Sequence, residues 1–113
     1  MKTVKFMNLE LIMGIKEKIA LEKELGTSPL VALFGMMGED GEELDFEKIP
    51  TLDVMVAILF HASQKLNHGI NREKMFEIID SFLEIDENSV MDLITVIVEV
   101  LQVSKYLPSV EAE

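Results

Sequence analysis

The segment Val90–Val103, VMDLITVIVEVLQV, constrains the fold most strongly because it is almost wholly apolar and yet carries a regular set of polar residues. These residues, spaced 3, 4 and 3 positions apart, are Asp92, Thr95, Glu99 and Gln102. A helix places such a set in one stripe, whereas a strand would distribute it over both faces. The β-branched content alone favours a strand. The spacing of the polar residues favours a helix instead. We predict this helix from Val90 to about Tyr106 and expect it to be buried on most of its circumference.

Capping residues mark the ends of two further helices in the first third of the chain. Asn8 can cap a helix that runs to about Leu25, because apolar residues recur at helical spacing after it. Gly26 follows where a left-handed C-terminal cap belongs. Ser28 then suits the N-cap of a short apolar helix, Pro29–Met37, since proline is favoured at the first helical position.

The second half of the chain shows the same pattern of caps and apolar spacing. Thr51 is predicted to cap a helix from Leu52 to about Asn67, and Asn71 a helix over Arg72–Glu84. Ser89, which precedes Val90, is followed three residues later by Asp92, and the two form a capping-box pattern. We expect the third and fifth helices to form the central pair, because each has only a narrow polar stripe.

These elements predict an all-α fold, a compact bundle of about five helices. Met1–Met7 alternates weakly between apolar and polar residues and is predicted to be a short extended or β-like N-terminal arm. Residues 38–50 contain two glycines, six acids and a proline, which indicates a loop. We therefore predict a single helical domain over residues 1–107 and a disordered acidic tail over residues 108–113.

Charge and hydropathy together point to a protein that binds other proteins. Twenty-one Asp and Glu against ten Lys and Arg give a formal net charge of −11, which argues against nucleic acid as a partner. Yet 49% of the residues are hydrophobic and the mean hydropathy is +0.26. A chain this short either packs them into a dense core or leaves apolar surface for a partner or for self-association.

The sequence also shows no targeting signal of a membrane or secreted protein. Lys5, Asn8 and Glu10 interrupt any apolar run near the N-terminus, so we expect no signal peptide. No apolar run approaches the roughly 18 residues of a transmembrane helix. We expect a cytoplasmic protein without a membrane partner.

No residue pattern indicates catalysis, a cofactor or a metal. The chain has no cysteine, and its two histidines, His61 and His68, would lie about two turns or roughly 10 Å apart on one helix. The acidic loop does not fit a calcium-binding EF-hand, because Leu44 and Asp45 stand where an oxygen ligand and the glycine are required. We expect no enzymatic activity.

The order of these signals resembles one known family. The chain reads ELGTSPL at Glu24–Leu30, IPTLDVMVAILFHASQKLNHGINREKMFEIIDSFLE at Ile49–Glu84 and SVMDLITVIVEVLQVSKYLP at Ser89–Pro108. This pattern of helix ends and apolar spacing is similar to that of the tail assembly chaperones of long-tailed, non-contractile bacteriophages of Gram-positive hosts. One departure is Lys105, where the family commonly has a glycine after the serine.

The resemblance implies an assembly factor that binds and solubilises the tape measure protein and recruits tail tube subunits. Such a protein works in the host cytoplasm and is absent from the mature virion. Recognition of helical clients needs exposed apolar surface. We expect the contact residues to be Val4, Phe6, Phe34, Met36, Met37, Leu44 and Phe46, and for each of them packing in the core is the competing interpretation.

An alternative function is an acidic helical inhibitor that covers the basic surface of a regulatory or nucleic-acid-binding protein. A mimic of DNA needs carboxylates spaced regularly along one exposed face. Here six acids are concentrated in one loop, so we rank this alternative below the chaperone.

Overall fold

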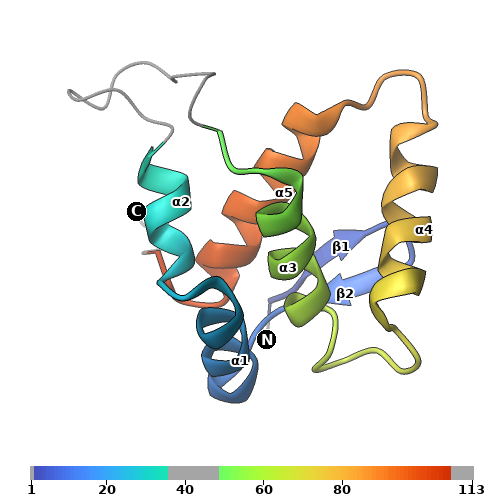
Figure 1. The fold of residues 1–113 in the computed structure, drawn as a ribbon. Coiled ribbons are helices and arrows are strands. Elements are labelled where there is room, and N and C mark those ends of the chain that lie inside the picture. The colour runs from blue at the N-terminus through green and yellow to red at the C-terminus, as the bar shows by residue number, and fades with distance from the viewer. Residues whose placement is uncertain (1, 36–48, 108–113) are drawn as a thin grey trace.

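The computed structural model describes residues 2–35 and 49–107, and within them the chain forms a small β-hairpin and five helices (Figure 1). In chain order the elements are β1 (Val4–Phe6), β2 (Leu9–Leu11), α1 (Ile15–Leu25), α2 (Pro29–Gly35), α3 (Leu52–Ala62), α4 (Arg72–Leu83) and α5 (Val90–Val103). The fold is therefore mostly helical with about five helices, as expected, and the predicted β-like N-terminal arm contains β1. The all-α class is confirmed only in part, because β1 pairs with a second strand to form a small sheet. The predicted tail at 108–113 and most of the acidic loop lie outside the described residues.

The β-hairpin replaces the first two turns of the predicted first helix. Its strands are antiparallel, with Val4 opposite Leu11 and Phe6 opposite Leu9. All four side chains are buried, and the residues between them in each strand are exposed. This two-residue period outweighs the helical spacing that predicts a cap at Asn8, because every apolar side chain of the hairpin strands then faces the core.

Helix α1 consequently begins at Ile15 rather than directly after Asn8. The backbone N–H of Gly14 donates to Oε1 of Glu17 at 2.8 Å, which satisfies one of the free donors at the start of the helix. At the other end, Gly26 has φ 77° and forms the predicted left-handed cap.

The side chain of Asn67 closes the outer edge of β2. Its Oδ1 accepts the backbone N–H of Glu10 at 3.3 Å, and its Nδ2 donates to the carbonyl of the same residue at 2.8 Å. Nearby, the N–H of Ile12 donates to the carbonyl of Ala62 at 3.1 Å. Asn67 makes these contacts from the turn that follows α3, because α3 ends at Ala62 instead of continuing to Asn67 as predicted.

The remaining predicted caps are confirmed. Thr51 accepts a backbone N–H of the first turn of α3 at 3.4 Å, and Asn71 does the same for α4 at 2.7 Å. At α5, the N–H of Ser89 donates to Asp92 Oδ2 at 2.7 Å, as a capping box requires. Local hydrogen-bonding chemistry therefore sets the starts of these three helices.

Helix α3 lies at the centre of the arrangement. It contacts α1, α4 and α5, while α5 also contacts β1 (Figure 1). The predicted contact of α3 with α5 is present, but α3 alone is central, because α1 and α4 pack mainly on α3. The fully buried residues of α3 that fill this core include Met55, Ile58 and Leu59.

The C-terminal end of α5 holds the hairpin in place. The buried Ser104 accepts the backbone N–H of Met13 on its Oγ at 2.9 Å, across 91 positions of sequence. Lys105 follows with φ 73°, a left-handed conformation that favours glycine. Its N–H donates to the carbonyl of Gln102, and that of Tyr106 donates to the carbonyl of Leu101, which together form a Schellman motif.

Replacing Ser104 with alanine should lower the free energy of unfolding by about 1–3 kcal/mol, because the buried N–H of Met13 loses its acceptor. Urea denaturation followed by circular dichroism measures this change. The matched control is Ser81→Ala on the exposed side of α4, which should change stability by less than about 0.5 kcal/mol. Equal effects of the two substitutions would contradict a special role for the Ser104 hydroxyl.

Replacing Lys105 with glycine should raise the free energy of unfolding by about 1 kcal/mol, because glycine adopts a positive φ without steric cost. Lys105→Ala removes the same side chain but keeps the Cβ, and it should give no such gain. Thermal and urea denaturation of the two variants in parallel checks this. A gain from alanine equal to that from glycine would show that backbone strain is not the cause.

Candidate functional site

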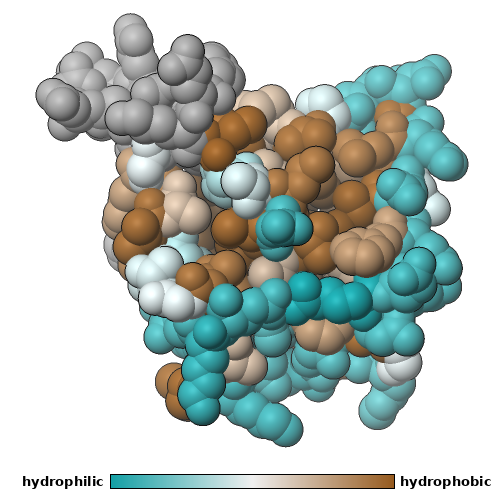
Figure 2. Space-filling view, in the orientation of Figure 1, coloured by the Kyte–Doolittle hydropathy of each residue, from teal (hydrophilic) through white to brown (hydrophobic). Residues whose placement is uncertain are grey.

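A broad apolar surface covers one side of the molecule. Figure 2 shows apolar side chains gathered over α2, α3 and α4, with hydrophilic side chains below them. Four large apolar side chains on these helices are about half exposed: Val31 59%, Phe34 53%, Leu52 57% and Phe76 46%. Exposure of this many large apolar groups on a small domain is typical of a protein-binding surface.

The middle of this surface belongs to α3. Leu52, Val56 and Phe60 are four residues apart, so they form a line along one side of the helix. Leu52 is exposed, and the other two are half-buried. Asp53 lies on the same side, because it precedes Val56 by three residues and Phe60 by seven. The exposed side of α3 is therefore apolar with a single carboxylate.

Helices α2 and α4 extend the surface on either side of α3. In α2, Val31 and Phe34 are exposed, while Leu33 is buried in the core. In α4, Phe76 lies one turn after Arg72, whose side chain reaches toward α1 and α3, so Phe76 lies on the flank of α4 nearest α3. We define the apolar face as the six residues Val31, Phe34, Leu52, Val56, Phe60 and Phe76.

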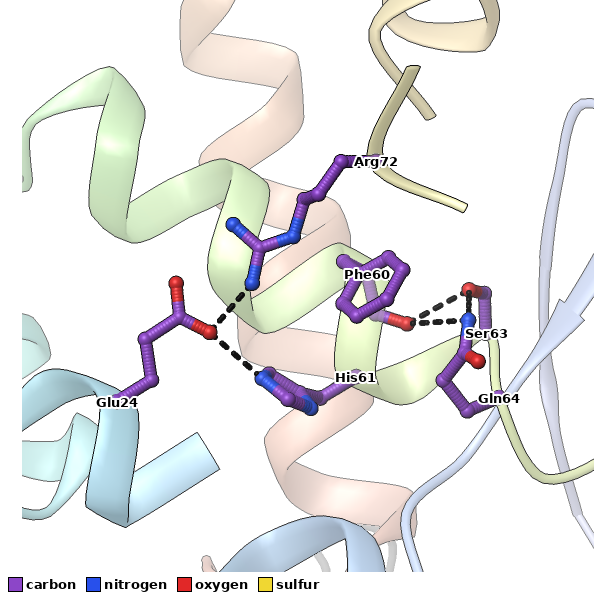
Figure 3. Close-up of polar contacts among 6 residues, drawn as sticks. All are labelled: Glu24, Phe60, His61, Ser63, Gln64 and Arg72. Atoms are coloured by element: carbon purple, nitrogen blue, oxygen red, sulfur yellow. Dashed lines mark hydrogen bonds and ion pairs between the residues drawn. The ribbon is translucent and has the colours of Figure 1, made fainter. Parts of the chain in front are cut away.

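A polar cluster connects three helices at the border of the apolar face. Oε1 of Glu24 on α1 accepts hydrogen bonds from Nε2 of His61 on α3, at 2.8 Å, and from the guanidinium of Arg72 on α4 (Figure 3). The guanidinium also lies over the ring of Phe60, 4.4 Å from its centroid. One carboxylate thus holds α1, α3 and α4 together, and the arginine covers one end of the apolar line on α3.

The hydrogen bond from Arg72 lowers the pKa of Glu24, burial opposes this, and His61 lowers the pKa further. The ionised form of Glu24 is therefore favoured. On the opposite side of α1, burial and a 2.7 Å hydrogen bond to Glu22 raise the pKa of Tyr106. Both groups join separate elements of the fold.

Metal-binding chemistry is also missing from the described residues, where no group of three or more His, Asp or Glu side chains could hold a metal ion. Among the same residues, no helix is both long enough and apolar enough to cross a lipid bilayer. The chemistry that the apolar face does offer is burial of a partner's apolar surface, stabilised by roughly 25 cal/mol per Å².

The structure separates the predicted contact residues into three groups. Phe34 is exposed and belongs to the apolar face. Val4 and Phe6 are buried, and the ring of Phe6 lies 5.0 Å from that of Phe82. These two residues are core residues of the hairpin in this fold, so we remove them from the contact surface. The other four predicted contacts, which lie outside the described residues, are Met36, Met37, Leu44 and Phe46.

Five members of the apolar face are absent from the contacts predicted by sequence, namely Val31, Leu52, Val56, Phe60 and Phe76. The four-residue spacing of Leu52, Val56 and Phe60 is a sequence signal that could have identified the α3 members. The polar residues of the predicted third helix obscure this signal, because a narrow polar stripe normally marks the solvent side of a helix. The structure shows instead that Asp53, one of those polar residues, shares its side of α3 with apolar residues.

Comparisons with protein-family models, with curated proteins and with solved structures find no match to this chain. The functional interpretation therefore depends on the geometry of the apolar face and its polar border.

Replacing Glu24 with glutamine should lower the free energy of unfolding at neutral pH by at most about 1 kcal/mol, since the cluster is partly exposed to solvent. The folded-state pKa of Glu24 is depressed. The ionised carboxylate therefore contributes to the free energy of unfolding at pH values above the unfolded-state pKa of about 4.3. The contribution is lost as the pH falls through the lower, folded-state pKa. The stability difference between wild type and variant should therefore shrink as the pH falls from neutral through the acid range.

Urea denaturation over that pH range measures the difference. Glu87→Gln, at an exposed position after α4, is the matched control and should show no such dependence. A difference for Glu24→Gln that stays constant across the range would contradict the ion-pair assignment.

Proposed function

We propose that this chain is a tail assembly chaperone of a long-tailed bacteriophage. It binds and solubilises the tape measure protein and recruits tail tube subunits while the tail is built. The observation that supports this proposal most strongly is the apolar face, which joins exposed side chains of α2, α3 and α4 on one side of a small domain.

The physical requirements of such a chaperone match the properties of the chain. A protein that keeps an apolar client soluble must offer the client apolar surface and remain soluble itself. The apolar face meets the first requirement, and a net charge of −11 meets the second. The order of capped helices from which the resemblance was drawn includes α3, α4 and α5.

The proposal places the protein in the host cytoplasm and outside the mature virion. It assigns the protein a binding role without catalysis, cofactor or metal, and it allows self-association. The alternative of an acidic inhibitor would engage its target through carboxylates, which gives the apolar face no role. We therefore favour the chaperone.

Co-expression with the tape measure protein encoded beside this chain should keep that client soluble and yield a complex that elutes together in size-exclusion chromatography. The double variant Phe34→Ser/Leu52→Ser should lose most of this effect, because it removes two exposed side chains of the apolar face. Both positions are more than half exposed, so the variant should retain its fold by circular dichroism.

The matched control is Ile15→Ser/Ile19→Ser on α1. These side chains are similarly exposed, at 68% and 49%, but lie outside the apolar face. The control should solubilise the client as wild type does. A client that stays insoluble with wild type present would refute the proposed function, and equal losses in both double variants would refute the assignment to the apolar face.

A further inference from the structure

We propose that the guanidinium of Arg72 is a displaceable cover on Phe60, and that its movement away from this ring lengthens the apolar face. The contacts among three side chains, those of Glu24, Phe60 and Arg72, support this inference. Its consequence for client binding rests on the proposed function, whereas the cover itself does not depend on that function.

Phe60 is the last residue of the apolar line on α3. It lies one turn beyond Val56 and two turns beyond Leu52, so its ring continues the same side of the helix. The guanidinium carbon of Arg72 lies 4.4 Å from the centroid of this ring, and the ring of His61 meets it edge-on at 5.2 Å. One end of the apolar line is therefore covered by a single arginine side chain, which can move without any change of the backbone.

One carboxylate oxygen holds Arg72 over the ring. Nη2 of Arg72 donates to Oε1 of Glu24, and Nε2 of His61 donates to the same oxygen at 2.8 Å (Figure 3). This single contact is weaker than a bidentate pair, in which two guanidinium nitrogens engage both carboxylate oxygens. The side chains of Arg72 and Glu24 are also 39% and 37% exposed, so water competes for both charges.

The covered arrangement leaves one donor of Arg72 without an acceptor. Its Nε is buried, and no described residue accepts a hydrogen bond from it. A buried donor without an acceptor raises the free energy of the arrangement that contains it. Rotation of the side chain into solvent gives this Nε water as an acceptor. The position over Phe60 is therefore only weakly favoured over an open one.

Displacement of Arg72 adds an aromatic ring to the accessible part of the apolar face. The line from Leu52 to Phe60 then extends uncovered over about two helical turns. A partner that covers Phe60 must first move Arg72, so by linkage its binding shifts Arg72 toward the open position. Glu24, which holds the arginine in place, thereby determines how much of the apolar face a partner reaches.

A tryptophan reporter tests the cover directly. The chain has no tryptophan, so Phe60→Trp places a single fluorophore beneath Arg72. In this background, Arg72→Ala should increase the quenching of tryptophan emission by acrylamide about twofold, because the cation over the ring is removed. The matched control is Lys74→Ala, which removes an exposed cation from the same turn of α4 and should leave quenching unchanged. Circular dichroism checks that each variant is folded.

A second variant tests the hold on Arg72 while keeping the arginine. In the same background, Glu24→Gln should increase quenching by less than Arg72→Ala does, because glutamine still offers a neutral oxygen. The matched control is Glu22→Gln, which changes the carboxylate of the same helix that binds Tyr106 and should have no effect. Quenching that neither Arg72→Ala nor Glu24→Gln increases would overturn the inference.

Binding of Nile red, an uncharged apolar dye, tests the cover with the native ring in place. Arg72→Ala should bind the dye about twofold to tenfold more tightly than wild type, because more apolar area is accessible. Lys74→Ala should bind the dye as wild type does. Weaker binding by Arg72→Ala would show that Arg72 is itself part of the binding surface, and it would overturn the inference.

Co-expression with the tape measure protein separates this inference from the proposed function. Arg72→Ala should keep at least as much of the client soluble as wild type does. If quenching and dye binding do not respond to Arg72→Ala while wild type solubilises the client, the cover is refuted and the chaperone proposal stands. If both respond as expected but the client stays insoluble with wild type and variant alike, the cover stands and the proposed function fails.

Discussion

The packing of α3 against three other helices is the interaction on which the rest of the structure depends. Met55, Ile58 and Leu59 are completely buried there, and each contributes about 1.5–3 kcal/mol by leaving water. Helices α1, α4 and α5 leave one side of α3 uncovered among the described residues. The uncovered side is the line from Leu52 to Phe60. Helix α3 therefore contributes one side to the core and another side to the apolar face.

The polar cluster fixes where the apolar face ends. Glu24 ties α1 to both α3 and α4, and the cation that it binds rests on the ring of Phe60. An aromatic ring beneath a guanidinium is no longer available to a partner on that side. The cluster therefore contributes to the shape of the binding surface as well as to the joining of the helices.

Local chemistry made much of the fold predictable. The caps at Gly26, Thr51 and Asn71 depend on single residues and their neighbours, and the structure has all three. The second strand of the hairpin was missed because Leu9 and Leu11 satisfy both a two-residue and a helical period. Pairing with β1, which packs on α5, accompanies the two-residue period. The contact of Asn67 with β2, in the turn after α3, is one that no local pattern contains.

The candidate site was less predictable than the fold for a related reason. Composition indicated that apolar residues exceed what a small core needs, but it cannot say which of them the core leaves out. Phe6 and Phe34 have the same side chain, yet one is buried and the other exposed. The assignment depends on which faces of α2 and α3 find a partner, and that is decided by tertiary packing.

The bond between Met13 and Ser104 has a consequence for synthesis on the ribosome. The hairpin is translated before α5, which packs against β1 and is the last of the described elements. The cover of the hairpin is therefore incomplete until α5 has left the exit tunnel. A ribosome that stalls before α5 has been made presents a chain whose core is unfinished.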